Sequence, residues 1–420
     1  MKCFLLIVLA ATVAGCTTGT RPPPDGPSAS AGAPITIGVL AGLTGQGAVD
    51  AAEIHLNVDL AIVQANAAGG IVGHPLQAAY ADTHGDQALA TRLARQLVEQ
   101  DHAAVLIGGV LSAECLALEQ AAASLEVVYL TASGCPAVAL TAGRCSKYTF
   151  RILPAAPQLI APLARYVTNV YGNRWAILYP DYAFGQAQAR TYETALAASG
   201  ASPPLEIAIP LGEQDPAPYV ARIPIDGTID GIINAENGAD LTAVDLALRQ
   251  SGNASHLPVV FSGGKEQFGG TYPDSVDGFL FSTVHVSNLP ADMSADDRAY
   301  ATAFAEQVTE QPQLAALLGG PTRAVSGALG YQTYATISAL RQTMLATHFT
   351  SRSDTQRLIA ALETFAAPAG ADFPGGAIQM NRADHQGTAT VYIARVAGQT
   401  VEILQSVPPG DVPPIGTCRV

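Results

Sequence analysis

Positively charged residues are scarce in this chain, and their scarcity excludes several classes of partner. The 420 residues include 21 Lys and Arg against 35 Asp and Glu, which gives a formal net charge of -14 at pH 7. Such a chain repels the phosphates of nucleic acids and the headgroups of anionic lipids. We therefore expect no nucleic-acid partner. An acidic surface is also ordinary for a soluble protein, so the charge alone identifies no partner.

Motifs that carry catalysis or hold cofactors are missing as well. Neither a GxSxG turn nor an HExxH pair occurs, and the eight histidines are scattered. The loop GLTGQG departs from GxGxxG spacing, and FSGGKE lacks the first glycine and the final Ser or Thr of a phosphate-binding loop. We expect no enzyme, cofactor or metal, although a carboxylate pair assembled from distant residues stays open.

Aromatic residues make up only 6% of the chain, whereas 49% of it is hydrophobic and 13% charged. A chain of this length and composition buries a large core, and its length suggests two domains. With few aromatics and 40 glycines, packing relies on small side chains and close approach of helices to sheets.

The N-terminus carries an export signal. Lys2 precedes an apolar run over residues 4–13 that is too short to span a bilayer as a stable anchor. The following Val-Ala-Gly-Cys resembles the bacterial lipobox, which predicts a signal peptide over 1–15 and lipidation at Cys16. Residues 17–34, rich in Pro, Gly, Ser and Thr, then form a flexible tether. An ordinary secreted protein cleaved nearby is the alternative.

Four cysteines remain after Cys3 leaves with the signal and Cys16 is lipidated, and four allow three pairings. Cys135 and Cys145 bracket a ten-residue loop, so they are the predicted disulfide. This pairing leaves Cys115 to bond Cys418, or both of them free. A metal site is the rival interpretation, but no CxxC spacing supports it.

Short β-branched runs alternate with longer alanine-rich stretches of helical period, which is typical of parallel sheets covered by helices. The predicted strands of the first half are 35–40, 76–82, 104–107 and 127–131, and its helices are 51–67, 87–100 and 113–124. The predicted strands of the second half are 175–179, 205–209, 231–234 and 259–262, and its helices are 158–171, 185–198 and 241–251. Two similar series predict two doubly wound α/β lobes.

The last part of the chain departs from that rhythm. Helices are predicted at 296–309, 324–345 and 354–364 without strong strands between them. The segment GGAIQMNRADHQGTATVYIARVAGQTVEIL predicts antiparallel strands with turns at NRADHQG and VAGQ.

Polar residues follow several predicted strands, where an α/β protein places its ligands. Ser112 stands in the first turn of a helix, where its hydroxyl and free backbone amides hold an anion or simply cap the helix, and both interpretations stay open. The remaining candidates of this kind are Thr131 and Ser133 in the first half and Tyr182, Phe184, Asn234, Glu236 and Asn237 in the second half.

The stretch from ITIGVL to VLIGG, over residues 35–109, resembles the start of the leucine, isoleucine and valine binding proteins of ABC transporters. The resemblance continues through YTFRILP and GYQTYATISAL to the final hairpin. It implies a type I periplasmic binding protein, with two Rossmann-like lobes joined by a three-segment hinge. By position, 35–153 with 285–365 form lobe 1, 154–284 with 366–410 form lobe 2, and 411–420 form a tail.

The resemblance also implies roles for single residues. Ser112, with Ser133 and Cys135, corresponds to the group that holds a ligand carboxylate, and Phe184 to an aromatic shield. Lys265 or Glu266 lies near the position of a carboxylate that pairs with the ammonium of an amino acid. Two departures stand out: Asp50 occupies a place that is usually aromatic, and Cys135 replaces a hydroxyl residue. Amides, urea-like compounds and aromatic acids therefore join amino acids as candidate ligands.

These inferences predict a lipid-anchored, monomeric receptor in the bacterial cell envelope that closes on a small polar ligand and delivers it to an ABC permease. The alternative is a lipoprotein of the same fold that senses a ligand and acts on a membrane kinase or cell-wall enzyme. The sequence itself does not separate the two.

Overall fold

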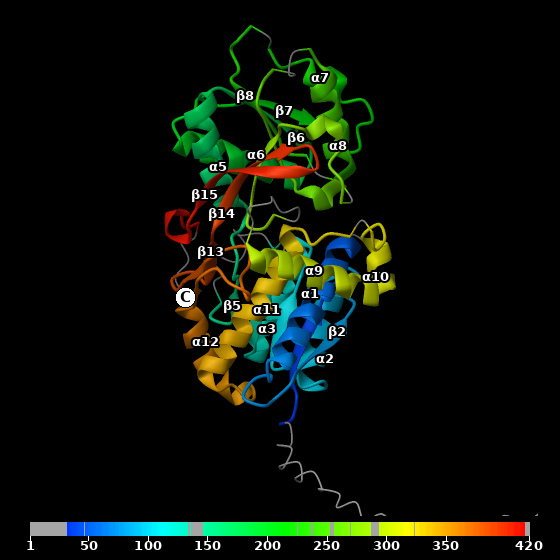
Figure 1. Cartoon of the computed structure of the whole chain (residues 1–420), viewed down its shortest axis with the longest axis vertical. Helices are drawn as coiled ribbons and strands as arrows, with labels where there is room; N and C mark the ends of the chain where they lie inside the picture. The colour runs from blue at the N-terminus through cyan, green and yellow to red at the C-terminus, as the bar shows by residue number, and fades with distance from the viewer. Residues whose placement is uncertain are drawn as a thin grey trace, which may run out of the picture.

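The computed structural model describes residues 32–415 except 46, 133–134, 136–145, 225, 237, 253–255, 269, 287–293 and 323, and it describes the backbone alone at 183, 238–239 and 266–267. The predicted lipidation site Cys16 and the predicted signal and tether up to residue 31 lie outside the described residues. The described chain forms two lobes, one above the other in Figure 1, joined by a narrow waist. Within the described part, no helix has the length and apolarity that crossing a bilayer requires.

The lower lobe is built on a parallel sheet of five strands in the order β2-β1-β3-β4-β5. The strands are β1 (Ile35–Leu40), β2 (Leu76–Ala81), β3 (Val105–Gly108), β4 (Val128–Thr131) and β5 (Thr149–Phe150). Every residue of β1, β3 and β4 is buried, as expected for strands that helices cover on both faces.

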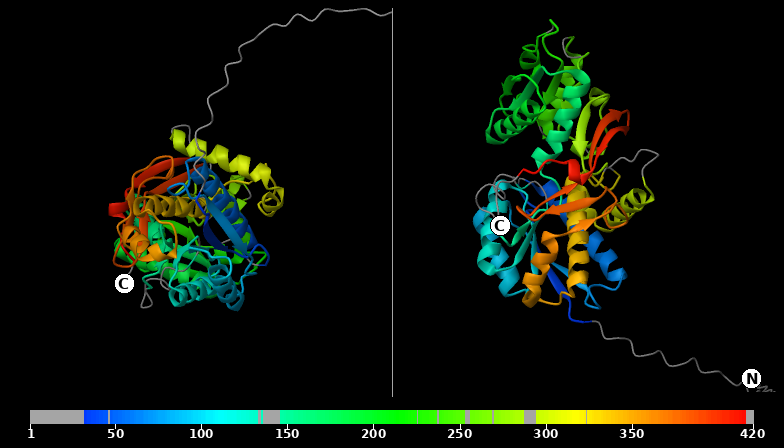
Figure 2. Two further views of the ribbon diagram at one scale, coloured as in Figure 1. Left: turned by 90° about the horizontal axis from the view of Figure 1, so that it is seen from below. Right: turned by 90° about the vertical axis from the view of Figure 1, so that its left-hand side faces the viewer.

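The helices of the lower lobe come from two distant parts of the chain. The first group is α1 (Ala48–Ala67), α2 (Gln87–Glu99) and α3 (Ser112–Leu125), and the second is α9 (Ala295–Glu310), α10 (Pro312–Leu317), α11 (Ala328–Thr347) and α12 (Thr355–Glu363). Helix α1 contacts α9, α10 and α11, so the late helices complete the covering of the early sheet. Figure 2 shows the late helices, in yellow and orange, beside the blue and cyan elements.

The upper lobe holds a seven-stranded sheet in the order β15-β14-β10-β9-β8-β6-β7. Its strands are β6 (Trp175–Pro180), β7 (Leu205–Ile209), β8 (Gly231–Asn234), β9 (Val259–Phe261), β10 (Leu280–Thr283), β14 (Val391–Ala397) and β15 (Thr400–Val407). Its helices are α5 (Ala156–Tyr171), α6 (Ala183–Ala198), α7 (Ala217–Val220) and α8 (Gly238–Gln250). The five strands β7, β6, β8, β9 and β10 are parallel to one another. Strand β14 runs antiparallel to both of its neighbours, β10 and β15.

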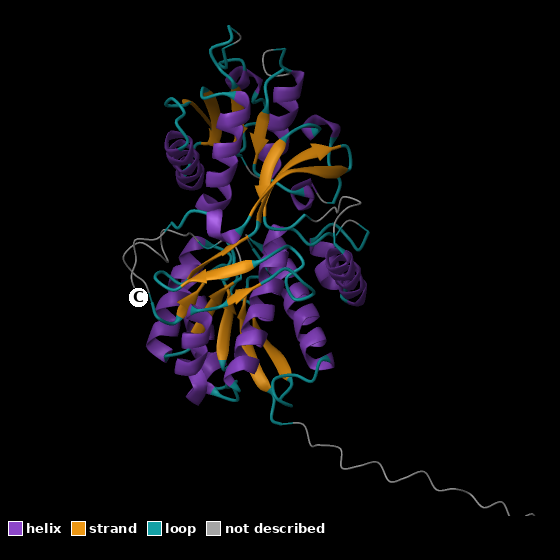
Figure 3. Cartoon of the chain, turned by 60° about the vertical axis from the view of Figure 1, so that its left-hand side comes forward, coloured by secondary structure: helices purple, strands orange, loops and turns teal. Residues whose placement is uncertain are grey.

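A third sheet and the C-terminal segment lie at the waist. Strands β11 (Ala366–Ala367), β12 (Ile378–Asn381) and β13 (Gln386–Ala389) form a small antiparallel sheet that contacts α12 of the lower lobe. After β15, the short turn Pro409–Asp411 returns to contact β12 and β13, and Val412 is buried. Figure 3 shows the small sheet between the two larger ones.

The two-lobed α/β architecture predicted from the sequence is confirmed, and so are the main elements. Strands β1, β7 and β8 have the predicted bounds, and the ends that differ elsewhere shift by one to four residues. The two C-terminal hairpins form around the predicted turns. Strand β10 was not predicted, because its sequence LFST is short and half polar.

Candidate functional site

The carboxyl edges of both large sheets face the waist. Strand β5 runs parallel to β4, and the chain leaves its carboxyl end to begin α5 of the upper lobe. Strand β10 runs parallel to β9, and the chain leaves its carboxyl end to return to α9 of the lower lobe. Parallel strands end at one edge of a sheet, so the loops after these strands lie toward the opposite lobe, where α/β proteins bind ligands.

In the lower lobe, two glycines make the turn from β3 into α3 tight. Gly108 has a φ of 138°, and a Cβ there would lie 1.9 Å from the carbonyl oxygen of Leu40. Gly109 has a φ of 83°, and a Cβ there would lie 2.7 Å from the hydroxyl of Tyr129. Only glycine fits both positions, and the close contact seats the first turn of α3 directly over the ends of β1 and β4.

A disulfide joins Cys115 in the first turn of α3 to Cys135 after β4, with 5.7 Å between their Cα atoms. The predicted Cys135–Cys145 bond is therefore wrong, and so is the expectation that Cys115 bonds Cys418 or stays free. Neighbouring strands β3 and β4 bring Cys115 and Cys135 together, and this proximity outweighs the shorter sequence gap to Cys145. Cys145 and Cys418 lie outside the described residues.

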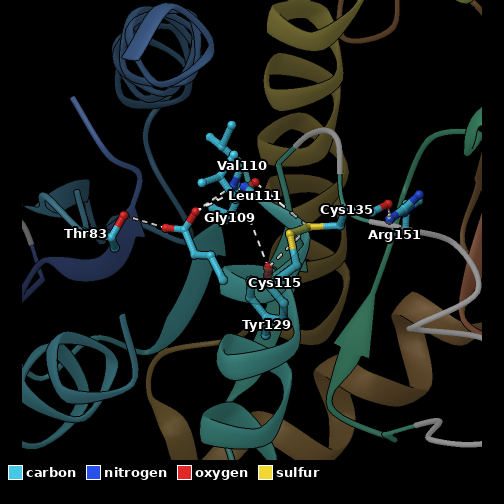
Figure 4. The surroundings of a disulfide bond; sticks show 10 residues. Thr83, Gly109, Val110, Leu111, Cys115, Tyr129, Cys135 and Arg151 are labelled. Carbon is cyan, nitrogen blue, oxygen red and sulfur yellow. Dashed lines mark hydrogen bonds between the residues drawn. A yellow bond between two sulfur atoms is a disulfide. The ribbon is translucent and has the colours of Figure 1, made fainter. Parts of the chain in front are cut away.

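The disulfide lies among buried polar atoms, as Figure 4 shows. The Tyr129 hydroxyl donates to the carbonyl oxygen of Gly108 at 3.0 Å, and the buried guanidinium of Arg151 donates to the carbonyl oxygen of Cys135. Because the sulfur of Cys135 is bonded and its residue is 2% exposed, this side chain is a cross-link and not a ligand-binding thiol.

Glu114 caps the start of α3 from within the protein. Its side chain is fully buried, and one oxygen accepts from the Thr83 hydroxyl at 2.5 Å. The other oxygen accepts from the backbone amides of Val110 at 3.0 Å and Leu111 at 3.3 Å. Both amides precede the first residue of α3, so the expectation that Ser112 and the amides of the first turn hold an anion or cap the helix stays a prediction.

The predicted residues of the first lobe share this edge but differ in exposure. Ser112 is the first residue of α3 and is exposed, and its hydroxyl makes no hydrogen bond to the described part of the chain. Thr131 ends β4 opposite Gly108 and is buried. Asp50 lies in the first turn of α1, half-buried, and burial raises the pKa of its carboxyl. Ser133 lies outside the described residues.

In the upper lobe, two predicted aromatic residues stack on each other after β6. Tyr182 precedes α6 and is half-buried, while Phe184 is 45% exposed. Their ring centroids are 6.0 Å apart with 28° between the ring planes. With Phe184 exposed and Tyr182 half-buried, this aromatic pair offers a partly accessible apolar surface at the carboxyl edge of the sheet.

Glu236 follows β8 and is the most perturbed carboxyl of the upper edge. It is 1% exposed, and its Oε1 has no hydrogen-bond partner among the described residues. Burial, with a smaller repulsion from Asp240, raises its pKa to about 8. The backbone amide of Glu236 donates to Asn234, whose side-chain amide in turn donates to Asp245 at 2.8 Å. Both polar atoms of the Asn234 side chain are therefore used within the lobe. The bond to the Glu236 amide fixes the turn on which Glu236 lies.

The other predicted residues of the upper lobe follow β8 and β9. Lys265 begins the short helix Lys265–Phe268, and its Nζ donates to the carbonyl oxygen of Gln399 at 3.3 Å. Burial lowers the pKa of Lys265. Asn237 lies outside the described residues, and so does the side chain of Glu266.

Three residues of this edge were not predicted from the sequence: Glu114, Thr83 and Arg151. A glutamate in the first turn of a helix is a recognised capping signal, so the capping role of Glu114 could have been predicted from the sequence. Thr83 and Arg151 carry no local signal, because only the sheet order brings Thr83 beside α3 and Arg151 beside Cys135.

The described residues contain no cluster of three or more His, Cys, Asp or Glu that could hold a metal ion. A groove of about 420 Å³ lies between α5 and the end of β15. Its lining includes Arg165, Tyr166 and Gln405 and none of the predicted ligand residues. The site assembled above therefore consists of the two facing sheet edges and not of this groove.

Comparison with known proteins agrees with this architecture. Residues 34–400 match the sequence model of a family described as periplasmic binding protein. A curated relative is the chemotactic signal transduction system substrate-binding protein BasB of Halobacterium salinarum, which is 32% identical over 321 residues, covering 71% of this chain and 74% of the relative.

Two solved structures illustrate the shared fold. An ABC transporter substrate-binding protein from Sphaerobacter thermophilus has a TM-score of 0.76 and 22% identity, covering 90% of this chain and 99% of the other. A solute-binding protein of an ABC transporter from Rhodopseudomonas palustris, in complex with 3,4-dihydroxybenzoic acid, has a TM-score of 0.70 and 18% identity, covering 89% and 97%.

Proposed function

The chain belongs to the periplasmic binding protein family, and on that premise we propose that it is a lipid-anchored solute receptor. Family membership implies that it works outside the cytoplasm. The receptor captures a small polar ligand by closure of the two lobes and delivers it to an ABC permease. Capture of this kind requires no catalysis and no cofactor, because closure excludes water and strengthens each hydrogen bond to the ligand.

The observation that carries this proposal is a pair of unpaired polar groups on facing edges. The exposed Ser112 hydroxyl of the lower lobe and the buried Oε1 of Glu236 in the upper lobe have no hydrogen-bond partner in the described chain. A buried polar atom without a partner is unfavourable unless something satisfies it in another state. A ligand between the lobes supplies that partner.

A sensory role is the second candidate, and one observation favours it. The relative BasB, 32% identical, is described as part of a chemotactic signal transduction system. The same capture step serves both roles, since a ligand-closed receptor can dock on a permease or on a membrane-bound signalling protein. Pull-down of the ligand-loaded, membrane-anchored chain from its own membranes separates them by the partner recovered.

The capture step is tested first at Ser112. The solute that copurifies with the protein is identified by native mass spectrometry, and its affinity is measured by calorimetry. We expect Ser112→Ala to weaken binding by about 1 to 3 kcal/mol, because the ligand loses a hydrogen bond in a dry site. Ser124→Ala, at the exposed far end of α3, is the control. Equal affinities of the wild type and Ser112→Ala contradict this role for Ser112.

A further inference from the structure

After β15 the chain crosses the waist once more, in addition to the connections that follow β5, β10 and β13. Strand β15 ends at Val407, which pairs with Val391 of β14 in the upper sheet. The next residues form the turn Pro409–Asp411, which contacts β12 and β13 of the small sheet. Figure 1 shows this red segment at the waist, beside β13. We call residues 407–412 the strap.

The small sheet at the far end of the strap is fastened to the lower lobe. The backbone amide of Met380 in β12 donates to the carbonyl oxygen of Phe365, just after α12, at 2.8 Å. The backbone of Arg151, just after β5, donates to His385 at 3.0 Å and accepts from Gly387 at 2.6 Å. The strap therefore joins the upper sheet to a part of the chain that is bonded to the lower lobe.

The sequence of the strap, Val-Pro-Pro-Gly-Asp-Val, makes it stiff. Proline holds φ at about -65° and has no amide proton, so Pro408 and Pro409 restrict the backbone without leaving a donor unpaired. The amide of Asp411 donates to the carbonyl oxygen of Pro408 at 3.0 Å. The amide of Val412 donates to the carbonyl oxygen of Pro409 at 3.3 Å. The strap is therefore a short bracket closed by its own hydrogen bonds, and not a flexible linker.

Both ends of the strap are buried, while most of its middle is not. Val407 is 6% exposed and Val412 is 4% exposed, whereas Pro408, Gly410 and Asp411 are exposed. The two valines anchor the strap on parts of the chain that belong to different lobes. Rotation of one lobe against the other must therefore bend the bracket or pull a valine side chain into water.

The groove of about 420 Å³ described above lies beside the strap. Its lining includes Pro408 and Asp411 of the strap together with Arg165 and Tyr166 of α5. A fully packed junction would leave no room for these parts to shift, because protein interiors are nearly close-packed. The groove provides such room, so the two buried valines, and not packing along the whole strap, restrict the movement.

We infer that the strap restrains the hinge, holding the two lobes near the arrangement described and limiting the angle through which one rotates against the other. The inference goes beyond the proposed function, because it concerns the motion of the lobes and no particular ligand. A restrained hinge leaves less conformational freedom for a ligand to remove when the lobes close on it.

The test measures the separation of the lobes in the ligand-free protein by double electron–electron resonance. One spin label replaces Arg92 of α2 and the other replaces Arg190 of α6, both exposed, and unnatural amino acids carry the labels so that the cysteines stay native. Val412→Asp should release the strap and widen the distribution of distances by about 1.5-fold or more, because an unpaired charge is not retained in a buried site.

A second variant lengthens the strap and keeps both anchors: three glycines inserted after Gly410 should widen the distribution in the same way. The same insertion after Gly398, in the turn between β14 and β15, is the matched control and should leave the width unchanged. Unchanged widths in the folded strap variants overturn the inference. Should Val412→Asp not fold, the insertion after Gly410 decides alone. Because no ligand is needed, the result is independent of whether the proposed receptor function holds.

Discussion

The two facing edges each carry a buried carboxyl group, and the two groups have opposite surroundings. Glu114 of the lower lobe accepts three hydrogen bonds from Thr83, Val110 and Leu111. Glu236 of the upper lobe is as deeply buried, yet its Oε1 has no partner in the described chain and its pKa is raised to about 8. The buried carboxyl of the lower edge thus has hydrogen-bond partners on both of its oxygens, whereas that of the upper edge has an oxygen without one in the described residues.

The two edges differ in how firmly their own contacts hold them. A disulfide, two glycines and a capped helix hold the lower edge in one conformation, which reduces the ordering cost of binding. The upper edge has a buried acid whose Oε1 lacks a partner in the described residues, and an aromatic pair of which only Phe184 is exposed.

The largest expected effect comes from removing the cross-link of the lower edge. Cys115→Ala should lower the free energy of unfolding by about 2 to 4 kcal/mol, because the bond closes a loop between residues 20 apart in sequence. Urea unfolding measures the loss, with Cys145→Ala as the control. A loss of equal size in the Cys145 variant would contradict the Cys115–Cys135 pairing.

The next effect comes from taking one donor away from Glu114. Thr83→Val conserves shape but deprives a buried carboxylate of a hydrogen bond, so we expect a loss of about 1.5 to 3 kcal/mol in unfolding free energy. Thr91→Val is the matched control, since that exposed hydroxyl donates only to the carbonyl of its own helix turn. If the two variants unfold at the same urea concentration, Glu114 does not depend on Thr83.

The smallest expected change in the free energy of unfolding is a gain in stability, and it comes from replacing Glu236. Its folded pKa of about 8 lies above the ordinary 4.5, so the folded state holds a proton that the unfolded state has lost. Its contribution to stability is complete below pH 4.5 and is lost as the pH rises through 8. Glu236→Gln should therefore be more stable than the wild type by about 1 to 2 kcal/mol at pH 9, and nearly equal at pH 4.

Thermal unfolding of both proteins across this pH range measures that difference. The same variant should bind the cognate ligand more weakly, which separates a functional acid from a merely strained one. A variant that is destabilised at pH 9 would show that Glu236 has a partner in the folded protein and that the two edges are alike.

Most of the fold was readable in the sequence because its signals are local. Alternation of β-branched runs with helical periods predicted β1 to β4, β6 to β9 and the longer helices between them, though not the short β5 and α7, and turn residues predicted the two C-terminal hairpins. Strand β10 was not predicted because its four residues lack an apolar run, and one of its two partners, β14, lies more than 100 residues later in the chain.

The candidate site was predicted less completely, since its members meet only through the sheet. Ser112, Tyr182 and Glu236 were placed after strands by local pattern, and the structure puts each at a carboxyl edge. Their surroundings were not predictable. The cap on α3 depends on Thr83, which is 31 residues from Glu114 in the sequence.

By itself, the sequence determined the class of architecture, the order of the elements and the residues that stand at the strand ends, because periodicity and turn chemistry act over a few neighbouring residues. Only the tertiary structure decided that Cys115 bonds Cys135. It also decided that both oxygens of Glu114 accept hydrogen bonds, whereas Oε1 of Glu236 has no partner in the described residues. These outcomes depend on which strands lie side by side, and strand order in a parallel sheet is set by packing across the whole lobe.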